Sequence, residues 1–275
     1  MKFSYFSLLL IFNFALSNIA FSEPIPIRFA EIYPVYFNDN GEIKGMDVDI
    51  INEVFSRANL DYKSVNRPFK RSLIEMQQGH VQVMTNITKN DDRSQYMEWI
   101  GPVRYSAIAL IVAKKDVNLS IKSSRDLLTV SKQTGKKFGD IVGASYSDFF
   151  DDMKANNEEF NDLFELVPEM DSNYKKLTAG RILGFFADDF EFNFLMSQAK
   201  EPNEPFDQFA IHAFRIEGSE GGAYIGISKT LGKESITRIQ QAFSSMVDDG
   251  TLETIHRRWS GEPIPAVLSE LLKQP

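Results

Sequence analysis

Two kinds of apolar pattern alternate along the chain. Ile25, Ile27 and Phe29 follow the period-2 spacing of a strand, and apolar residues at 48, 51, 54 and 55 then follow helical spacing. The stretch 38–41 between them reads Asn-Asp-Asn-Gly, and these residue types tolerate a positive φ. The chain therefore opens with a strand, a turn and a helix.

Continuous apolar runs predict further strands that are covered on both faces. These strands lie at 108–113, 141–144, 182–187 and 224–227, and a further short strand is expected at 81–84. A helix is expected between Pro68 and Gly79, and an apolar stripe from Ile236 to Val247 predicts a second one, followed by a short helix to Trp259. The tail from Gly261 is expected on the surface. Strands that alternate with helices predict α/β sheets that are mostly parallel.

The first 22 residues have the pattern of a secretory signal peptide. Lys2 precedes an apolar run that reaches Leu16, and Ala20-Phe21-Ser22 forms a small-x-small cleavage site. Polar residues interrupt the run before the roughly 20 residues that a spanning helix needs, which argues against an uncleaved anchor. We therefore expect an exported, periplasmic product that is a soluble monomer.

Composition narrows the classes of function. A chain of 275 residues with 43% hydrophobic residues forms one large or two medium domains. The formal net charge of −8 gives little electrostatic support for a nucleic-acid partner. Without Cys and with three scattered His, disulfides, thiolate sites and zinc sites are not expected. A small-molecule ligand without a metal or cofactor fits best.

Motifs of the common hydrolases are incomplete. The sequence Gly143-Ala-Ser-Tyr-Ser147 lacks the second glycine of a nucleophile elbow. Ser172 and Lys175 match SxxK, but the companion motifs of that class are missing. We assign no catalytic residue.

The most informative stretch runs from Gly79 to Pro102. A strand leads into a polar loop that contains Thr85, Asn86 and Thr88, and Arg93 follows. Open α/β sheets bind ligands at the carboxyl ends of their strands, and Arg suits bidentate capture of a carboxylate. The alternative is a capping loop in which Arg93 pairs with Asp91 or Asp92.

Two further loops are candidate binding segments. Ser145, Tyr146 and Ser147 follow a predicted strand and precede a helix, where free N–H groups can hold an anion or a serine can act as the N-cap. Asp188 and Asp189 end a buried run, where one of them can meet an ammonium group or cap a helix.

The order of several short motifs resembles that of the extracellular solute-binding proteins of family 3, the periplasmic binding proteins of ABC importers that include binders of polar amino acids. The resemblance spans nearly the whole chain after the signal. It depends on the motifs Gly41-x-x-x-Gly-Met-Asp-Val-Asp-Ile50, Leu73–Gly79, Asp92-Arg93, Gly101-Pro102, Leu177-x-x-Gly-Arg181, Asp249-Gly-Thr-Leu252 and Trp259.

The resemblance implies a two-lobed α/β fold of the periplasmic binding protein type II, with the ligand in a cleft between the lobes. It suggests lobe one at 23–108 and 218–275, and lobe two at 109–217. It also implies that Arg93 holds the α-carboxylate of an amino acid and that Asp188, on the opposite lobe, holds the α-ammonium after closure. The remaining ligand contacts that it implies are Thr85, Asn86, Thr88, Ser145, Tyr146, Ser147, Tyr33, Tyr36 and Phe69.

Three functional hypotheses follow from this resemblance. The first is a non-enzymatic protein that closes on an amino acid or related carboxylate and delivers it to an inner-membrane ABC permease. The second is a periplasmic dehydratase of the cyclohexadienyl type, because that enzyme uses the same scaffold. The third is a ligand-sensing domain that reports to a receptor.

Overall fold

The structure is a computed structural model that describes residues 23–198 and 207–273. The predicted signal peptide falls on residues 1–22 and therefore lies outside the described residues. The strands of the described part are β1 Ile25–Arg28, β2 Phe37–Asp39, β3 Glu42–Lys44, β4 Tyr62–Ser64, β5 Val83–Ile87, β6 Met97–Ser106, β7 Ile108–Ala113, β8 Lys137–Ile141, β9 Phe164–Val167, β10 Ile182–Asp188, β11 Phe209–Arg215 and β12 Gly221–Ser228. The α-helices are α1 Met46–Ala58, α2 Phe69–Gln77, α3 Asp91–Ser94, α4 Asp126–Thr134, α5 Asp148–Asn156, α6 Glu158–Asn161, α7 Met170–Thr178, α8 Asp189–Gln198, α9 Lys233–Asp248, α10 Thr251–Ser260 and α11 Ala266–Leu271.

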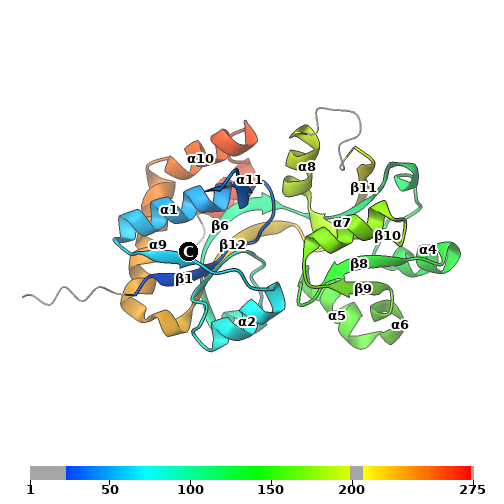
Figure 1. Cartoon of the computed structure of the whole chain (residues 1–275), viewed down its shortest axis with the longest axis horizontal. Coiled ribbons are helices and arrows are strands. Elements are labelled where there is room, and N and C mark those ends of the chain that lie inside the picture. The colour runs from blue at the N-terminus through cyan, green and yellow to red at the C-terminus, as the bar shows by residue number, and fades with distance from the viewer. Residues whose placement is uncertain (1–22, 199–206, 274–275) are drawn as a thin grey trace, which may run out of the picture.

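Two five-stranded sheets form the two halves of the molecule (Figure 1). The first has the order β4-β1-β5-β12-β6 and the second the order β11-β7-β10-β8-β9. The two-lobed α/β prediction is confirmed, with one correction. Each sheet is mixed, because β12 runs antiparallel to β5 and β6, and β7 runs antiparallel to β10 and β11.

The chain passes between the sheets at two neighbouring places. It leaves the first sheet at Ser106 and enters the second at Ile108, and it returns between Arg215 and Gly221. β6 and β12 pair along their length up to the register Ser106–Gly221, so the two crossings lie side by side (Figure 1). This arrangement joins the halves through paired strands and not through a flexible linker.

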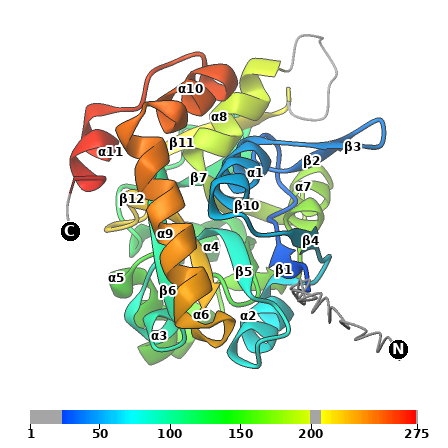
Figure 2. The ribbon, with the colours of Figure 1, turned by 90° about the vertical axis from the view of Figure 1, so that its left-hand side faces the viewer.

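Helices cover both faces of the first sheet. The predicted apolar stripe of α1 is confirmed, because Val48, Ile51, Val54 and Phe55 are all buried in the core with residues of α9 and α10. α2 packs on the other face through a separate apolar cluster. In Figure 2, α9 crosses in front of the sheet and α1 lies beside it.

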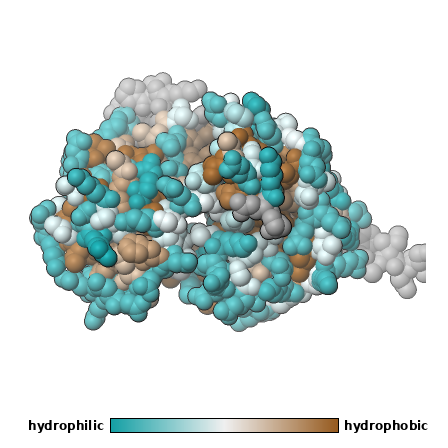
Figure 3. Space-filling model, turned by 180° about the vertical axis from the view of Figure 1, so that it is seen from behind, coloured by the Kyte–Doolittle hydropathy of each residue, from teal (hydrophilic) through white to brown (hydrophobic). Residues whose placement is uncertain are grey.

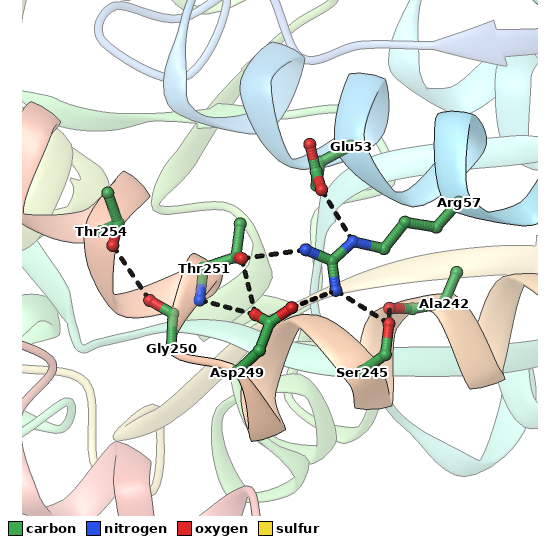
Figure 4. A network of polar contacts seen from close by, with 8 residues as sticks. All are labelled: Glu53, Arg57, Ala242, Ser245, Asp249, Gly250, Thr251 and Thr254. Atoms are coloured by element: carbon green, nitrogen blue, oxygen red, sulfur yellow. Dashed lines mark hydrogen bonds and ion pairs between the residues drawn. The ribbon is translucent and has the colours of Figure 1, made fainter.

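One arginine ties the covering helices together (Figure 4). Arg57, in the last turn of α1, donates to Glu53 in its own helix at 2.7 Å. It also donates to Ser245 and Asp249 at the end of α9, and to Thr251 at the start of α10. These hydrogen bonds hold the predicted Asp249-Gly250 helix break against α1.

Aromatic residues fill much of the second half. α4, α5 and α6 contribute to one apolar cluster, whereas α7 and α8 contribute to a second one. In the first cluster, the rings of Phe160, Phe164 and Phe186 each lie within 5.6 Å of the ring of Phe150 and meet it at steep angles. Edge-to-face packing of this kind adds to the stabilisation that apolar burial provides.

Some element boundaries differ from those expected. The strand predicted at 141–144 lies instead at Lys137–Ile141, because Gly143 has a φ of +86° in a turn that follows the strand. The strand predicted at 81–84 begins later, at Val83. The C-terminal tail contains helix α11, in which Leu268 is fully buried.

The surface seen from behind is mostly hydrophilic, and a furrow separates the two halves (Figure 3).

Among the described residues, no helix is both long and apolar enough to cross a membrane.

Candidate functional site

A cavity of about 850 Å³ lies between the two sheets. Its lining comes from the carboxyl ends of β1, β5, β8 and β10, the start of α2 and the turns that precede α5 and α7. Parallel strands of α/β sheets end at such clefts, so the fold itself directs these loops toward one space. The volume lies within the range of small-molecule sites.

Arg93 lines this cavity from the short helix α3, whose N-cap is Asn90. The guanidinium is almost fully buried, and it donates to the carbonyl oxygens of Thr88 at 2.7 Å and Gly143 at 3.2 Å. In the described part of the chain, no carboxylate forms an ion pair with it, so neither Asp91 nor Asp92 neutralises Arg93. Burial lowers the pKa of this guanidinium, but arginine remains charged in proteins. A buried positive charge therefore faces the cavity without a bound acid.

Asp188 lines the cavity from the end of β10. Its Oδ1 accepts hydrogen bonds from the backbone N–H groups of Phe190 at 2.9 Å and Glu191 at 3.3 Å, which caps α8. Its Oδ2 accepts a hydrogen bond from the hydroxyl of Ser106. Burial raises the pKa of this carboxyl, and the charge of Arg104 opposes that shift. The residue thus acts as a helix cap and also presents an acid to the cavity.

Asp189 has a different environment and does not line the cavity. Its Oδ1 accepts from the N–H of Ala107 at 3.0 Å, and its Oδ2 pairs with Arg215 at 3.0 Å. Both partners lie at the crossings between the sheets.

Most of the other residues expected at the ligand also line the cavity: Phe69, Asn86, Thr88, Ser145, Tyr146 and Ser147. Asn86 has a φ of +53° and donates to Glu191 at 2.6 Å. The hydroxyl of Ser145 donates to Asp151, and it accepts from Asn90 of the other half at 3.0 Å.

The two residues after Ser145 have structural partners. Tyr146 donates its hydroxyl hydrogen to Asp140, and burial raises the pKa of this tyrosine well above its usual value. Ser147 is the N-cap of α5, where its hydroxyl accepts from the N–H of Phe150. This bond uses one of the helix's free N–H groups, as the capping alternative predicts.

Three of the expected contact residues do not line the cavity. Thr85 is fully buried within β5, because successive strand side chains point to opposite faces and Asn86 takes the cavity side. Tyr36 stacks on Phe29, with ring centres 4.8 Å apart. Tyr33 packs between Phe37 and Phe194. We therefore leave these three residues out of the site.

A buried charge network that reaches the wall of the cavity was not expected from the sequence. Arg104 on β6 is fully buried and donates to Asp47 of α1 at 2.6 Å, to Asn86, and to Glu191 of α8 at 3.3 Å. Burial raises the pKa of Glu191 well above its usual value, and the nearby Asp188 charge adds to the shift. The available signal was Arg104 after the apolar run Trp99–Val103 of the crossing strand, because a charged residue that is buried requires a partner.

Helix α8 follows a strand of the second sheet and packs against both halves, because Phe192 belongs to an apolar cluster of the second half. Phe190 contacts the core of the first sheet, and Glu191 belongs to the Arg104 network. The ring of Phe194 lies 5.3 Å from that of Tyr33. In Figure 1, α8 lies above the crossing strands, between the two halves.

Among the described residues, no group of three or more His, Asp or Glu side chains is arranged to hold a metal ion. The cavity instead presents separate cationic and acidic side chains, which suits a small polar molecule with both kinds of charge.

Comparison with known proteins supports this interpretation. The model of a family described as bacterial extracellular solute-binding proteins, family 3, matches residues 30–262. The histidine-binding periplasmic protein of Salmonella typhimurium is 27% identical over 265 residues, which cover 92% of this chain and 95% of that protein. The probable amino-acid-binding protein YxeM of Bacillus subtilis is 22% identical over 84% of this chain and 81% of its own.

Solved structures show the same fold. The arginine-, lysine-, histidine-binding protein ArtJ of Geobacillus stearothermophilus superposes with a TM-score of 0.72 at 19% identity, over 92% of this chain and 100% of that one. An ancestral arginine-binding protein bound to arginine gives a TM-score of 0.69 at 21% identity, over 87% of this chain and 99% of that one.

Proposed function

Because the chain belongs to the bacterial extracellular solute-binding proteins of family 3, we propose that it captures an amino acid in the cavity between its sheets. The family is one of binding proteins, so the dehydratase alternative is set aside. The observation that carries the proposal is Arg93, a buried guanidinium that faces the cavity without an acid partner. The related proteins named above, which bind histidine, arginine or lysine, support an amino acid as the ligand.

In this proposal, Arg93 binds the α-carboxylate and Asp188 binds the α-ammonium group. The lobes are residues 23–108 with 218–275, and residues 109–217, and they rotate about the two crossings to close on the ligand. The signal peptide directs the protein to the periplasm, where the closed form delivers its ligand to an inner-membrane ABC permease. Neighbouring permease genes would support this transport role over the receptor alternative.

A thermal-unfolding screen against the twenty amino acids tests the proposal. A ligand at 100 times its Kd should stabilise the protein by about 2.7 kcal/mol, which raises the midpoint of unfolding by several degrees. Failure of every amino acid to shift the midpoint at millimolar concentration would contradict amino-acid binding.

Replacement of Asp188 separates its two roles. Asp188→Asn keeps a side chain that caps helices well but removes the charge, so we expect about tenfold weaker binding of the amino acid found in the screen. Calorimetry measures the Kd.

Asp189→Asn is the matched control. It removes a partly exposed ion pair with Arg215, so the free energy of unfolding should fall by about 1 kcal/mol or less. The Kd for the amino acid should stay unchanged. Weaker binding by Asp189→Asn together with normal binding by Asp188→Asn would show that the wrong acid was chosen.

A further inference from the structure

Arg28 is a second buried guanidinium in the cavity. It ends β1, is 6% exposed and lines the same space as Arg93. Its Nε donates to the carbonyl oxygen of Arg67 at the long distance of 3.5 Å. Its Nη2 lies 4.0 Å from the Glu169 carboxylate across the cleft. Within the described chain, neither terminal nitrogen of Arg28 has a hydrogen bond.

Arg28 and Arg93 share one neighbour, the ring of Phe69. The guanidinium carbon of Arg28 lies 5.4 Å from the ring centre, and that of Arg93 lies 5.6 Å from it. The two positive charges are therefore no farther apart than the sum of these distances. A ligand that contacts Phe69 is within reach of both.

The buried acids of the cavity are already partnered, in contrast to these arginines. Asp188 accepts three hydrogen bonds, and Glu191 is bonded to Asn86 and Arg104. Glu169, the carboxylate nearest to Arg28, is 47% exposed and approaches it only to 4.0 Å, a long distance for an ion pair. The buried charges that lack a close partner are therefore both positive. Burial of an unpaired charge is unfavourable, and a bound anion would relieve it.

We propose that Arg28 binds a second anionic group of the ligand, and that the ligand class is amino acids with an anionic side chain. This inference rests on the proposed function, because it assigns the α-carboxylate to Arg93 and the α-ammonium to Asp188. The groups that the proposal brings to the ligand, Arg28, Arg93 and Asp188, sum to one positive charge, which complements the single net negative charge of aspartate or glutamate. The other acids of the lining are Glu191, which pairs with Arg104, and the exposed residues Glu31, Asp91, Asp148, Glu169, Asp171 and Glu220. The planar fork of Arg28 suits a carboxylate.

A comparison of ligands that have nearly the same shape but differ in charge tests the inference. Calorimetry compares glutamate with glutamine, and aspartate with asparagine, on the wild-type protein. We expect the acidic member of at least one pair to bind at least about tenfold more tightly, because its amide isostere leaves Arg28 without an anion. Equal or tighter binding of the amides, or a preference for arginine, lysine or histidine, would overturn the inference and leave amino-acid binding intact.

Arg28→Met should reduce the preference for the acid over the amide to about twofold or less, with little change in the affinity for the amide. Arg28→Lys keeps the positive charge, so it should retain part of the preference for the acid over the amide. This variant replaces Arg28→Met in the test if the methionine variant does not fold. Arg67→Met is the control, because Arg67 is a neighbouring but 43% exposed arginine that does not line the cavity. An unchanged acid-to-amide ratio in Arg28→Met would contradict the inference. No binding of any amino acid by the wild-type protein would overturn both proposals.

Discussion

Replacement of Arg104 by methionine is expected to lower the free energy of unfolding by about 3–5 kcal/mol. Arg104 is the cation shared by Asp47 and Glu191, and all three side chains are at least 96% buried. Methionine fills similar space but leaves two buried carboxyl groups without a positive partner. Burial already raises the pKa of both groups, so each must take up a proton or remain charged at a high cost. Denaturant unfolding at neutral pH measures the loss.

Arg215→Met provides the comparison. Arg215 also pairs with an acid of the crossing region, but its side chain is 30% exposed. Solvent weakens such a pair, so its removal should cost about 1 kcal/mol or less. Equal losses in Arg104→Met and Arg215→Met would show that the buried network does not hold α8 against the first half.

Replacement of Arg93 should have the largest effect on binding. Arg93→Met removes a buried charge–charge contact with the proposed α-carboxylate, and the Kd should rise by about 100-fold. Arg93→Lys keeps the charge but loses the planar fork, so a rise of at least about tenfold is expected. Calorimetry with the amino acid identified by the screen measures both values.

The fold should survive both changes, because the partners of the Arg93 guanidinium are two backbone carbonyl groups and no buried acid. The unfolding midpoint without ligand is therefore the control. Normal binding by Arg93→Lys in a fully folded protein would make Arg93 a structural residue.

Periodicity predicted the longest helices, α1 and α9, because an amphipathic stripe is a local pattern. The predicted stripe of α9 runs from Ile236 to the Asp249-Gly250 break, and the structure agrees at the C-terminal end but begins the helix three residues earlier, at Lys233. The sequence also predicted the turn between β2 and β3, because Asn40 and Gly41 tolerate a positive φ and both adopt one in the structure. The apolar run at 141–144 was wrongly predicted to be a strand, because an apolar turn cannot be distinguished from an apolar strand by its composition.

The site could be predicted only in part. Arg93 follows a strand, Asp188 ends one, and the resemblance implied a role for both. Arg28 and Arg104 each follow an apolar run in a strand, and their burial depends on segments far away in the sequence. Tyr33 and Tyr36 illustrate the opposite case, because side-chain direction in a loop is set by tertiary packing against Phe37 and Phe29.

The attachment of α8 to the first half bears on how the protein would move. Asp188 stands between β10, which belongs to the second sheet, and α8, which Phe190 and Glu191 anchor to the first half. It also accepts a hydrogen bond from Ser106, the residue at which the chain leaves the first sheet. During a rotation of the second sheet, Asp188 would therefore lie near the axis and move little. The ammonium group of a ligand could bind there in the open form, so that closure would mainly bring the remaining loops of the second half onto a ligand already in place.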